Sequence, residues 1–129
     1  MMRGNAMHVI SAAAAPRFQL PGVEFAVFAA PSLGSAGLCA WRLTVDEGHV
    51  GDAPHTLDRD EIFTVLSGTV QLGPDGEKLG PGDSAVVPAG ELISLSNLGE
   101  GKAELIVAIT AGFTGHMADG TAVQPPWSK

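Results

Sequence analysis

The stretch PHTLDRDEIFTVLSG, residues 54–68, joins ionisable side chains to a strand-like run and carries most of the information about the fold. It contains His55 and Glu61, the apolar run IFTVL, and a closing Ser-Gly turn that predicts a hairpin with the following run TVQLG. Imidazole and carboxylate groups serve as metal ligands and as acid–base groups, so the stretch predicts the start of a functional site. A metal site needs three or four protein donors, and the stretch supplies only part of such a set.

Length and charge restrict the classes of protein to consider. A chain of 129 residues is the size of one domain with one core. It carries 14 acidic and 7 basic residues with no basic cluster, so its field repels phosphate backbones and anionic lipid. Cys39 is the single cysteine and cannot form an internal disulfide, and no apolar run reaches the roughly 20 residues that span a bilayer. We therefore expect a cytoplasmic protein with neither nucleic acid nor a membrane as its partner.

Glycines and prolines divide the rest of the chain into short runs. The sequence has 17 glycines and 9 prolines, and the runs between them are too short for helices of ordinary length. The run LCAWRLTVD, residues 38–46, alternates apolar and polar side chains, which is typical of a strand with one face in a core. About eight to ten such strands, separated by turns, predict an all-β fold, either a sandwich or a barrel.

The flanking segments complete the expected domain organisation. We expect residues 1–15 to be a flexible N-terminal segment, residues 16–113 to form the β-barrel, and residues 114–129 to be an irregular tail. Trp127 in this tail is predicted to dock on the barrel. The run AELIVAIT, residues 103–110, is apolar on both faces except at Glu104, which favours a strand packed between the core and a second subunit. A homodimer is therefore expected.

Two spaced motifs make the chain resemble the cupins, a family of small jelly-roll β-barrels. The first cupin motif is Gly-x5-His-x-His-x(3,4)-Glu-x6-Gly, and here His55, Glu61 and Gly68 keep its spacing. The leading glycine is Gly48, one residue further away than the motif asks, and the second histidine is replaced by Leu57. The resemblance implies an all-β cupin-type jelly-roll barrel with a single domain.

The second cupin motif, Gly-x5-Pro-x-Gly-x2-His-x3-Asn, is also partly kept. Gly82, Pro88, Gly90 and Asn97 lie at its spacing, and Ile93 stands where the motif has its histidine. In metal-binding cupins three histidines and a glutamate converge inside the barrel, so the resemblance implies that only His55 and Glu61 remain of four ligands. Leu57 and Ile93 place hydrocarbon where a metal ion needs lone pairs.

Other side chains are candidates to complete a metal site. Glu91 and His49 are the leading substitutes for the missing ligands, and Asp60, Cys39 and His116 are further candidates. Each also has an ordinary structural interpretation, as a surface charge, a loop histidine or a small buried side chain. The sequence does not identify a cofactor, and a divalent metal ion is the one candidate.

The retained pair also allows functions without a metal. His55 and Glu61 could act together as an acid–base pair, as in cupin-like epimerases that use a histidine with an acidic partner. Trp41, Leu57, Phe63, Ile93 and Leu95 are predicted to line an apolar pocket for a small molecule, with core packing as the alternative. The favoured function is binding of a small molecule without a tightly bound metal. The alternatives are a metal-dependent oxygenase or isomerase and a metal-free epimerase-like enzyme.

Overall fold

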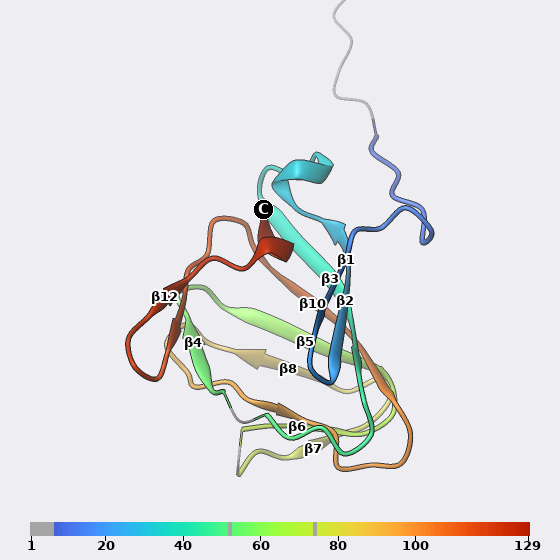
Figure 1. The fold of residues 1–129 in the computed structure, drawn as a ribbon, viewed down its shortest axis with the longest axis vertical. Coiled ribbons are helices and arrows are strands. Elements are labelled where there is room, and N and C mark those ends of the chain that lie inside the picture. Colours follow the sequence, from blue (N-terminus) through green and yellow to red (C-terminus); the bar gives the residue numbers. More distant parts are fainter. Residues whose placement is uncertain (1–6, 52, 74) are drawn as a thin grey trace, which may run out of the picture.

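The computed structural model describes residues 7–51, 53–73 and 75–129, and within them the chain forms twelve strands and two short 3-10 helices (Figure 1). In chain order the elements are β1 (Arg17–Leu20), β2 (Val23–Ala29), η1 (Pro31–Leu33), β3 (Leu38–Val45), β4 (His55–Leu57), β5 (Glu61–Ser67), β6 (Val70–Leu72), β7 (Lys78–Leu79), β8 (Ser84–Val87), β9 (Leu95–Ser96), β10 (Ala103–Thr110), β11 (Gly115–Met117), β12 (Ala122–Val123) and η2 (Pro126–Ser128). The predicted all-β fold is confirmed.

The strands form two layers. One is a six-stranded antiparallel sheet in the order β1-β2-β3-β10-β5-β8. The other consists of two three-stranded sheets, β12-β11-β4 and β7-β6-β9, which an isolated bridge between His55 and Ile93 joins. We call the first the large sheet and the second the small layer. Residues that are distant in sequence, such as those of β3 and β10, lie side by side in the large sheet.

Strict alternation explains why the large sheet has one buried face. In β3 the side chains at odd positions, from Cys39 to Val45, are buried, while Leu38 and Arg42 are exposed. In β10 the odd positions are buried as well, and β5 follows the same pattern from Glu61 to Val65. Because successive side chains of a strand point to opposite faces, these inward side chains form one hydrophobic core between the two layers.

The passage from β5 to β6 differs from the expected hairpin. The Ser-Gly turn was predicted to pair the two strands, but β5 pairs with β10 and β8 whereas β6 pairs with β7 and β9. Gly68 has a φ of 81°, and a Cβ there would lie 2.7 Å from the Cα of Ala103. The left-handed backbone and the close approach therefore require glycine, and the chain crosses from the large sheet to the small layer at this point.

Asn97, the last residue of the second cupin motif, fixes a turn in the barrel wall. Its side chain is fully buried, and its amide nitrogen donates to the carbonyls of Val45, at 3.2 Å, and Gly101, at 2.9 Å. Its amide oxygen accepts a hydrogen bond from the backbone N–H of Gly99 at 3.1 Å. These bonds tie the turn after β9 to the end of β3, so the motif asparagine has a structural role here.

The C-terminal tail is more ordered than its sequence suggests. Residues 114–129 were expected to be irregular, yet β11 pairs with β4 and with β12, so the small layer extends into the tail. The Trp127 indole stacks on the Phe25 ring, with ring centroids 3.9 Å apart and an angle of 17° between the planes. Buried Cys39 donates its thiol hydrogen to the carbonyl of Ser128 at 3.5 Å. The tail thus covers the core beside β2 and β3.

Within the described parts of the chain, no helix is long and apolar enough to cross a membrane.

Candidate functional site

Glu61 is a buried carboxyl group at the start of β5. Its register partners are Ile109 on β10 and Val87 on β8, and alternation directs its side chain into the core on the same face as Phe63. Only 4% of the residue is exposed. Among the described residues, none forms a hydrogen bond or an ion pair with its carboxyl group.

Burial governs the protonation of Glu61. Removal from water disfavours the charged carboxylate and raises the pKa of Glu61 from its ordinary value of 4.5 to about 8. The group is therefore mostly a neutral carboxylic acid at pH 7, with one O–H to donate. A protonated carboxyl group in an apolar setting can donate a hydrogen bond to a ligand or supply a proton as a general acid.

His55 lies in the small layer and faces the same core. Its backbone N–H donates to the carbonyl of Ile93 at 3.0 Å, and its carbonyl accepts from the N–H of Ile93 at 2.7 Å. On β4 it shares a face with buried Leu57, so its half-buried ring points inward. Burial lowers the pKa of His55, and the carbonyl of Ala53, 3.5 Å from Nδ1, opposes this shift. A neutral ring that donates from Nδ1 keeps Nε2 as a hydrogen-bond acceptor or base.

The two groups come from opposite layers and are not bonded to each other. His55 belongs to β4 in the small layer, and Glu61 to β5 in the large sheet (Figure 1). Neither a hydrogen bond nor an ion pair within 4.0 Å joins these two described residues. Both are uncharged at neutral pH because burial shifts each pKa toward the neutral form.

The side chains around this pair do not fit the metal centre of the cupin motifs. Leu57 is 7% exposed and Ile93 is 4% exposed, and both pack in the hydrophobic core. No group of three or more histidine, cysteine, aspartate or glutamate side chains able to hold a metal ion occurs in the described residues. His55 and Glu61 alone provide two of the three or four donors that a protein site for zinc or a similar ion requires.

The proposed substitute ligands lie in other surroundings. The His49 ring packs against Gly22 at the turn between β1 and β2, and Glu91 is exposed in the loop between β8 and β9. Asp60 accepts a hydrogen bond from the N–H of Ala89 at 3.0 Å. Cys39 is buried beneath the C-terminal tail, and His116 is exposed on β11. The structure does not gather any of these with His55 and Glu61 into a set of three donors.

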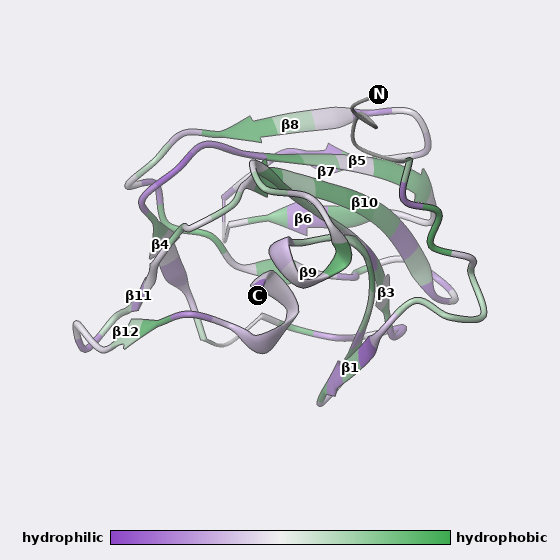
Figure 2. Ribbon diagram, turned by 90° about the horizontal axis from the view of Figure 1, so that it is seen from above, coloured by the Kyte–Doolittle hydropathy of each residue, from purple (hydrophilic) through white to green (hydrophobic). Residues whose placement is uncertain are grey.

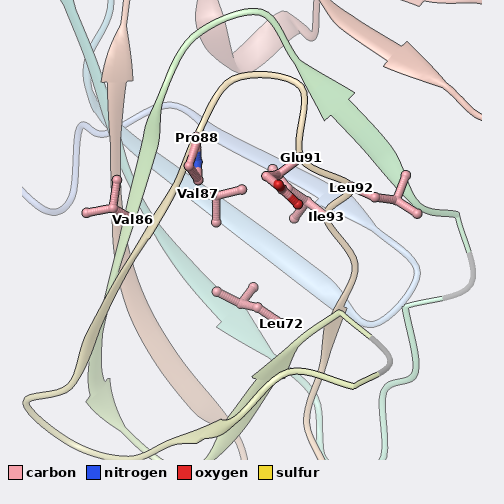
Figure 3. A pocket seen from close by; sticks show the side chains of 7 residues that line it. All are labelled: Leu72, Val86, Val87, Pro88, Glu91, Leu92 and Ile93. Carbon is pink, nitrogen blue, oxygen red and sulfur yellow. The ribbon is translucent and has the colours of Figure 1, made fainter.

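The residues predicted to line a pocket have two different surroundings. Trp41, Leu57 and Phe63 are buried members of the core, and Leu95 packs half-buried against it. Ile93 belongs to the core and also borders a hollow of about 230 Å³. The hollow lies between β8, the loop after it, and β6 (Figure 3). Its lining consists of Leu72, Val86, Val87, Pro88, Glu91, Leu92 and Ile93.

Neither His55 nor Glu61 lines the hollow, but a strand neighbour of each does. Val87 is the register partner of Glu61, and Ile93 is the bridge partner of His55. Glu91 is the one charged side chain of the lining. The sequence did not predict Leu72 and Val87 as lining residues. Alternation along a strand cannot reveal the hollow, because the hollow arises where the edge strand β8 diverges from the loop that leads to β9.

Fold and site together define a small two-layered jelly-roll domain with an apolar interior that contains one buried carboxyl group and one half-buried imidazole. The family model of the Cupin domain matches residues 41–109, more than half of the chain. The protein belongs to the cupin family. No curated protein matches its sequence.

Solved structures support the same fold. KdgF from Halomonas sp. superposes with a TM-score of 0.67 at 22% identity, over 83% of this chain and 94% of that one. A protein of unknown function with a cupin-like fold from Ralstonia eutropha JMP134 gives 0.71 at 19% identity, over 95% and 78% of the two chains. The polyketide cyclase RemF from Streptomyces resistomycificus gives 0.69 at 18% identity, over 81% and 80%. At these identities the likeness shows the fold and leaves the activity open.

Proposed function

We propose that this cupin domain binds a small, mostly apolar molecule in the hollow beside Val87 and Ile93, without a tightly bound catalytic metal. The observation that carries the proposal is the position of the hollow over the strand neighbours of both Glu61 and His55. At about 230 Å³ the hollow is smaller than the roughly 300–1,000 Å³ of usual ligand cavities, which favours a ligand of few heavy atoms.

The charges near the hollow favour an uncharged ligand. His55 and Glu61 are both neutral at pH 7, so the interior offers hydrogen-bonding groups and no fixed charge. The Glu91 carboxylate at the rim and the net charge of −7 both oppose an anion. A single hydroxyl group on an apolar ring would match these surroundings.

Phenol is a suitable probe for this site. We expect it to shift the methyl resonances of Leu72, Val87 and Ile93 in NMR spectra, with roughly millimolar affinity for so small a molecule. Val87→Phe should fill the hollow and weaken binding at least about tenfold, because the added ring takes the space of the ligand. Val50→Phe, at a site that is 61% exposed and outside the hollow, serves as the control.

Benzoate, the charged analogue of similar size, should bind more weakly than phenol. Equal shifts with both probes would contradict the preference for an uncharged ligand. Phenol shifts that persist in Val87→Phe would show that the hollow is not the binding site.

A second candidate function is metal-free acid–base catalysis. It is supported by a neutral imidazole and a protonated carboxyl group that face one apolar interior. With a ketone as substrate, Nε2 of His55 would take an α-proton while Glu61 donates its proton to the carbonyl oxygen, which gives the enol. Reversal in heavy water returns a deuteron to the α-carbon.

Cyclohexanone in heavy water tests this candidate. We expect the protein to accelerate α-proton exchange at least about tenfold over free imidazole at the same concentration, as measured by proton NMR. His55→Gln should abolish the acceleration, because the amide has no basic nitrogen. Exchange no faster than with free imidazole would exclude enolisation of this ketone and leave phenol binding as the surviving proposal.

We also propose a cytoplasmic location, which the single, unpaired Cys39 supports.

A further inference from the structure

The two edges of the large sheet differ in what covers them. At one edge, β1 contains Arg17, which pairs with Glu24 at 2.8 Å, and the centroid of its Phe18 ring lies 6.4 Å from that of Trp127 in the tail. At the other edge, β8 has the sequence SAVV without a charged side chain, and among the described residues it pairs with β5 alone. Figure 2 shows β8 at the border of the sheet, hydrophobic over most of its length. Charges or neighbouring segments usually block an edge strand, so β8 is the edge left open for pairing.

The register shows which backbone groups of β8 point to the free side. The carbonyl of Asp83, just before β8, accepts a backbone N–H of β5 at 2.9 Å. In an antiparallel ladder, residues that exchange hydrogen bonds with the partner strand alternate with residues that do not. Ala85 and Val87 therefore bond to β5, and the N–H and C=O groups of Ser84 and Val86 point away from it. No backbone group of the described residues bonds to these four groups.

The hollow lies beside this open edge. Val86 and Val87 both border it, and their side chains lie on opposite sides of the strand (Figure 3). A strand added to β8 would place every second side chain on the same face as Val87. On that face the hollow of about 230 Å³ is bordered by Leu72 and by Leu92, which is 54% exposed. The hollow is therefore placed to accept one apolar side chain of an added strand.

The charge around β8 selects a basic segment. Residues 80–97, which comprise β8 and the segments on both sides of it, include Asp83 and Glu91 and contain no lysine, arginine or histidine. Asp83 lies at one end of β8, and Glu91 lies at the rim of the hollow beyond the other end. The net charge of −7 acts in the same direction. Basic side chains at the two ends of an added strand would thus meet opposite charge, and acidic ones would be repelled.

We propose that the edge of β8 binds an extended segment of another protein, an apolar side chain flanked by lysine or arginine, as an added antiparallel strand. Two of its residues, separated by one, exchange backbone hydrogen bonds with Ser84 and Val86. The residue opposite Val87 directs its apolar side chain to the hollow. In strand addition the backbone bonds give affinity and the pocket gives specificity. The proposal rests on the hollow of the proposed function for this side chain, whereas the backbone pairing is independent of it.

Amide hydrogen exchange, followed by NMR, tests the pairing with a defined peptide. Acetyl-Lys-Leu-Thr-Val-Thr-Lys-amide would place its leucine opposite Val87 and its two threonines opposite Val86 and Ser84. With saturating peptide we expect the N–H groups of Ser84 and Val86 to exchange at least about tenfold more slowly, because they become hydrogen-bonded. The N–H groups of Ala85 and Val87, which bond to β5, should exchange slowly in both states. Slow exchange of Ser84 and Val86 without peptide would mean that another strand, such as that of a second copy, already covers the edge, and would overturn the proposal.

Methylation of the peptide nitrogens tests which side of the peptide faces β8. Methyl groups on both threonine nitrogens remove the two donors that face the edge, and should weaken binding at least about tenfold in calorimetric titration. A methyl group on the valine nitrogen, which faces solvent in the added strand, should leave the affinity nearly unchanged. An equal loss with both methylated peptides, or no loss with either, would overturn the antiparallel pairing.

Proline substitution makes the matching test in the protein. Val86→Pro removes an N–H from the free side only, a position at which edge strands tolerate proline, so the circular dichroism should stay that of the wild type. Peptide binding should weaken at least about tenfold. Gln19→Pro is the matched control, because Gln19 is exposed and its N–H points to the free side of β1 at the other edge. Undiminished peptide binding by Val86→Pro would overturn the proposal.

Phenol separates this proposal from the proposed function. Phenol shifts without any binding of the peptide would overturn strand addition and leave the hollow as a small-molecule site. Peptide binding with the expected loss in Val86→Pro, but without phenol shifts, would support strand addition and overturn the proposed function.

Discussion

Replacing Glu61 with Gln should remove most of the loss of stability that the wild-type protein shows between pH 5 and pH 8. The folded state holds the proton of Glu61 up to about pH 8, whereas the unfolded chain releases it near pH 4.5. Between these values the unfolded state binds fewer protons, so the free energy of unfolding falls as pH rises, by about 1.4 kcal/mol per pH unit. Below pH 4.5 both states are protonated, and above pH 8 both are ionised, so the slope disappears.

The expected size of this effect is large for a single side chain. From pH 5 to pH 8 the stability of Glu61→Gln should rise relative to that of the wild type by about 3–4 kcal/mol, as measured by urea unfolding at each pH. His55 titrates in both proteins, so its contribution cancels in the difference. Glu100→Gln, at an exposed loop position, should leave the pH dependence unchanged. If Glu61→Gln and the wild type lose stability in parallel, the buried carboxyl group is not the source of the slope.

Restoring histidine at the two altered motif positions should create a metal site. In Leu57→His/Ile93→His, two imidazoles would join His55 and Glu61, which gives the four donors of the cupin motifs. We expect this variant to bind Zn²⁺ or Co²⁺ at one ion per chain, at least about 1,000-fold more tightly than the wild type. Such a gain corresponds to about 4 kcal/mol of binding free energy.

Calorimetric titration and the visible absorption of Co²⁺ measure this gain directly. Leu57→Gln/Ile93→Gln is the control, because it adds polar groups of similar length that are poor ligands for these ions. Loss of the site in Leu57→His/Ile93→His with an added His55→Ala would show that the motif histidine is a ligand. A wild-type protein that already binds one ion as tightly, and loses it in His55→Ala, would contradict the proposal of a metal-free site.

Local patterns in the sequence predicted individual strands correctly. The alternation in LCAWRLTVD and AELIVAIT predicted strands with buried odd positions, and both strands form with that burial. The spacing of the cupin motifs predicted the family, which the family model confirms. Local patterns succeed here because the period of two along a strand is a property of the backbone itself.

The partner of each strand could not be predicted in the same way. The turn at Gly68 suggested a hairpin, yet the two strands belong to different layers. The tail lacked a clear period, yet β11 pairs with β4, and Trp127 stacks on Phe25. These contacts join residues far apart in the chain, so their energies depend on surfaces that exist only once the layers have formed.

The sequence by itself determined that this is a cupin and that hydrocarbon stands at two of the four ligand positions, because residue identity and spacing can be read without coordinates. Only the tertiary structure decided how Glu61 and His55 are charged, since their pKa values depend on burial by residues from several strands. It also decided where the hollow lies. The hollow arises from the way the two layers pack and end, which no single stretch of sequence encodes.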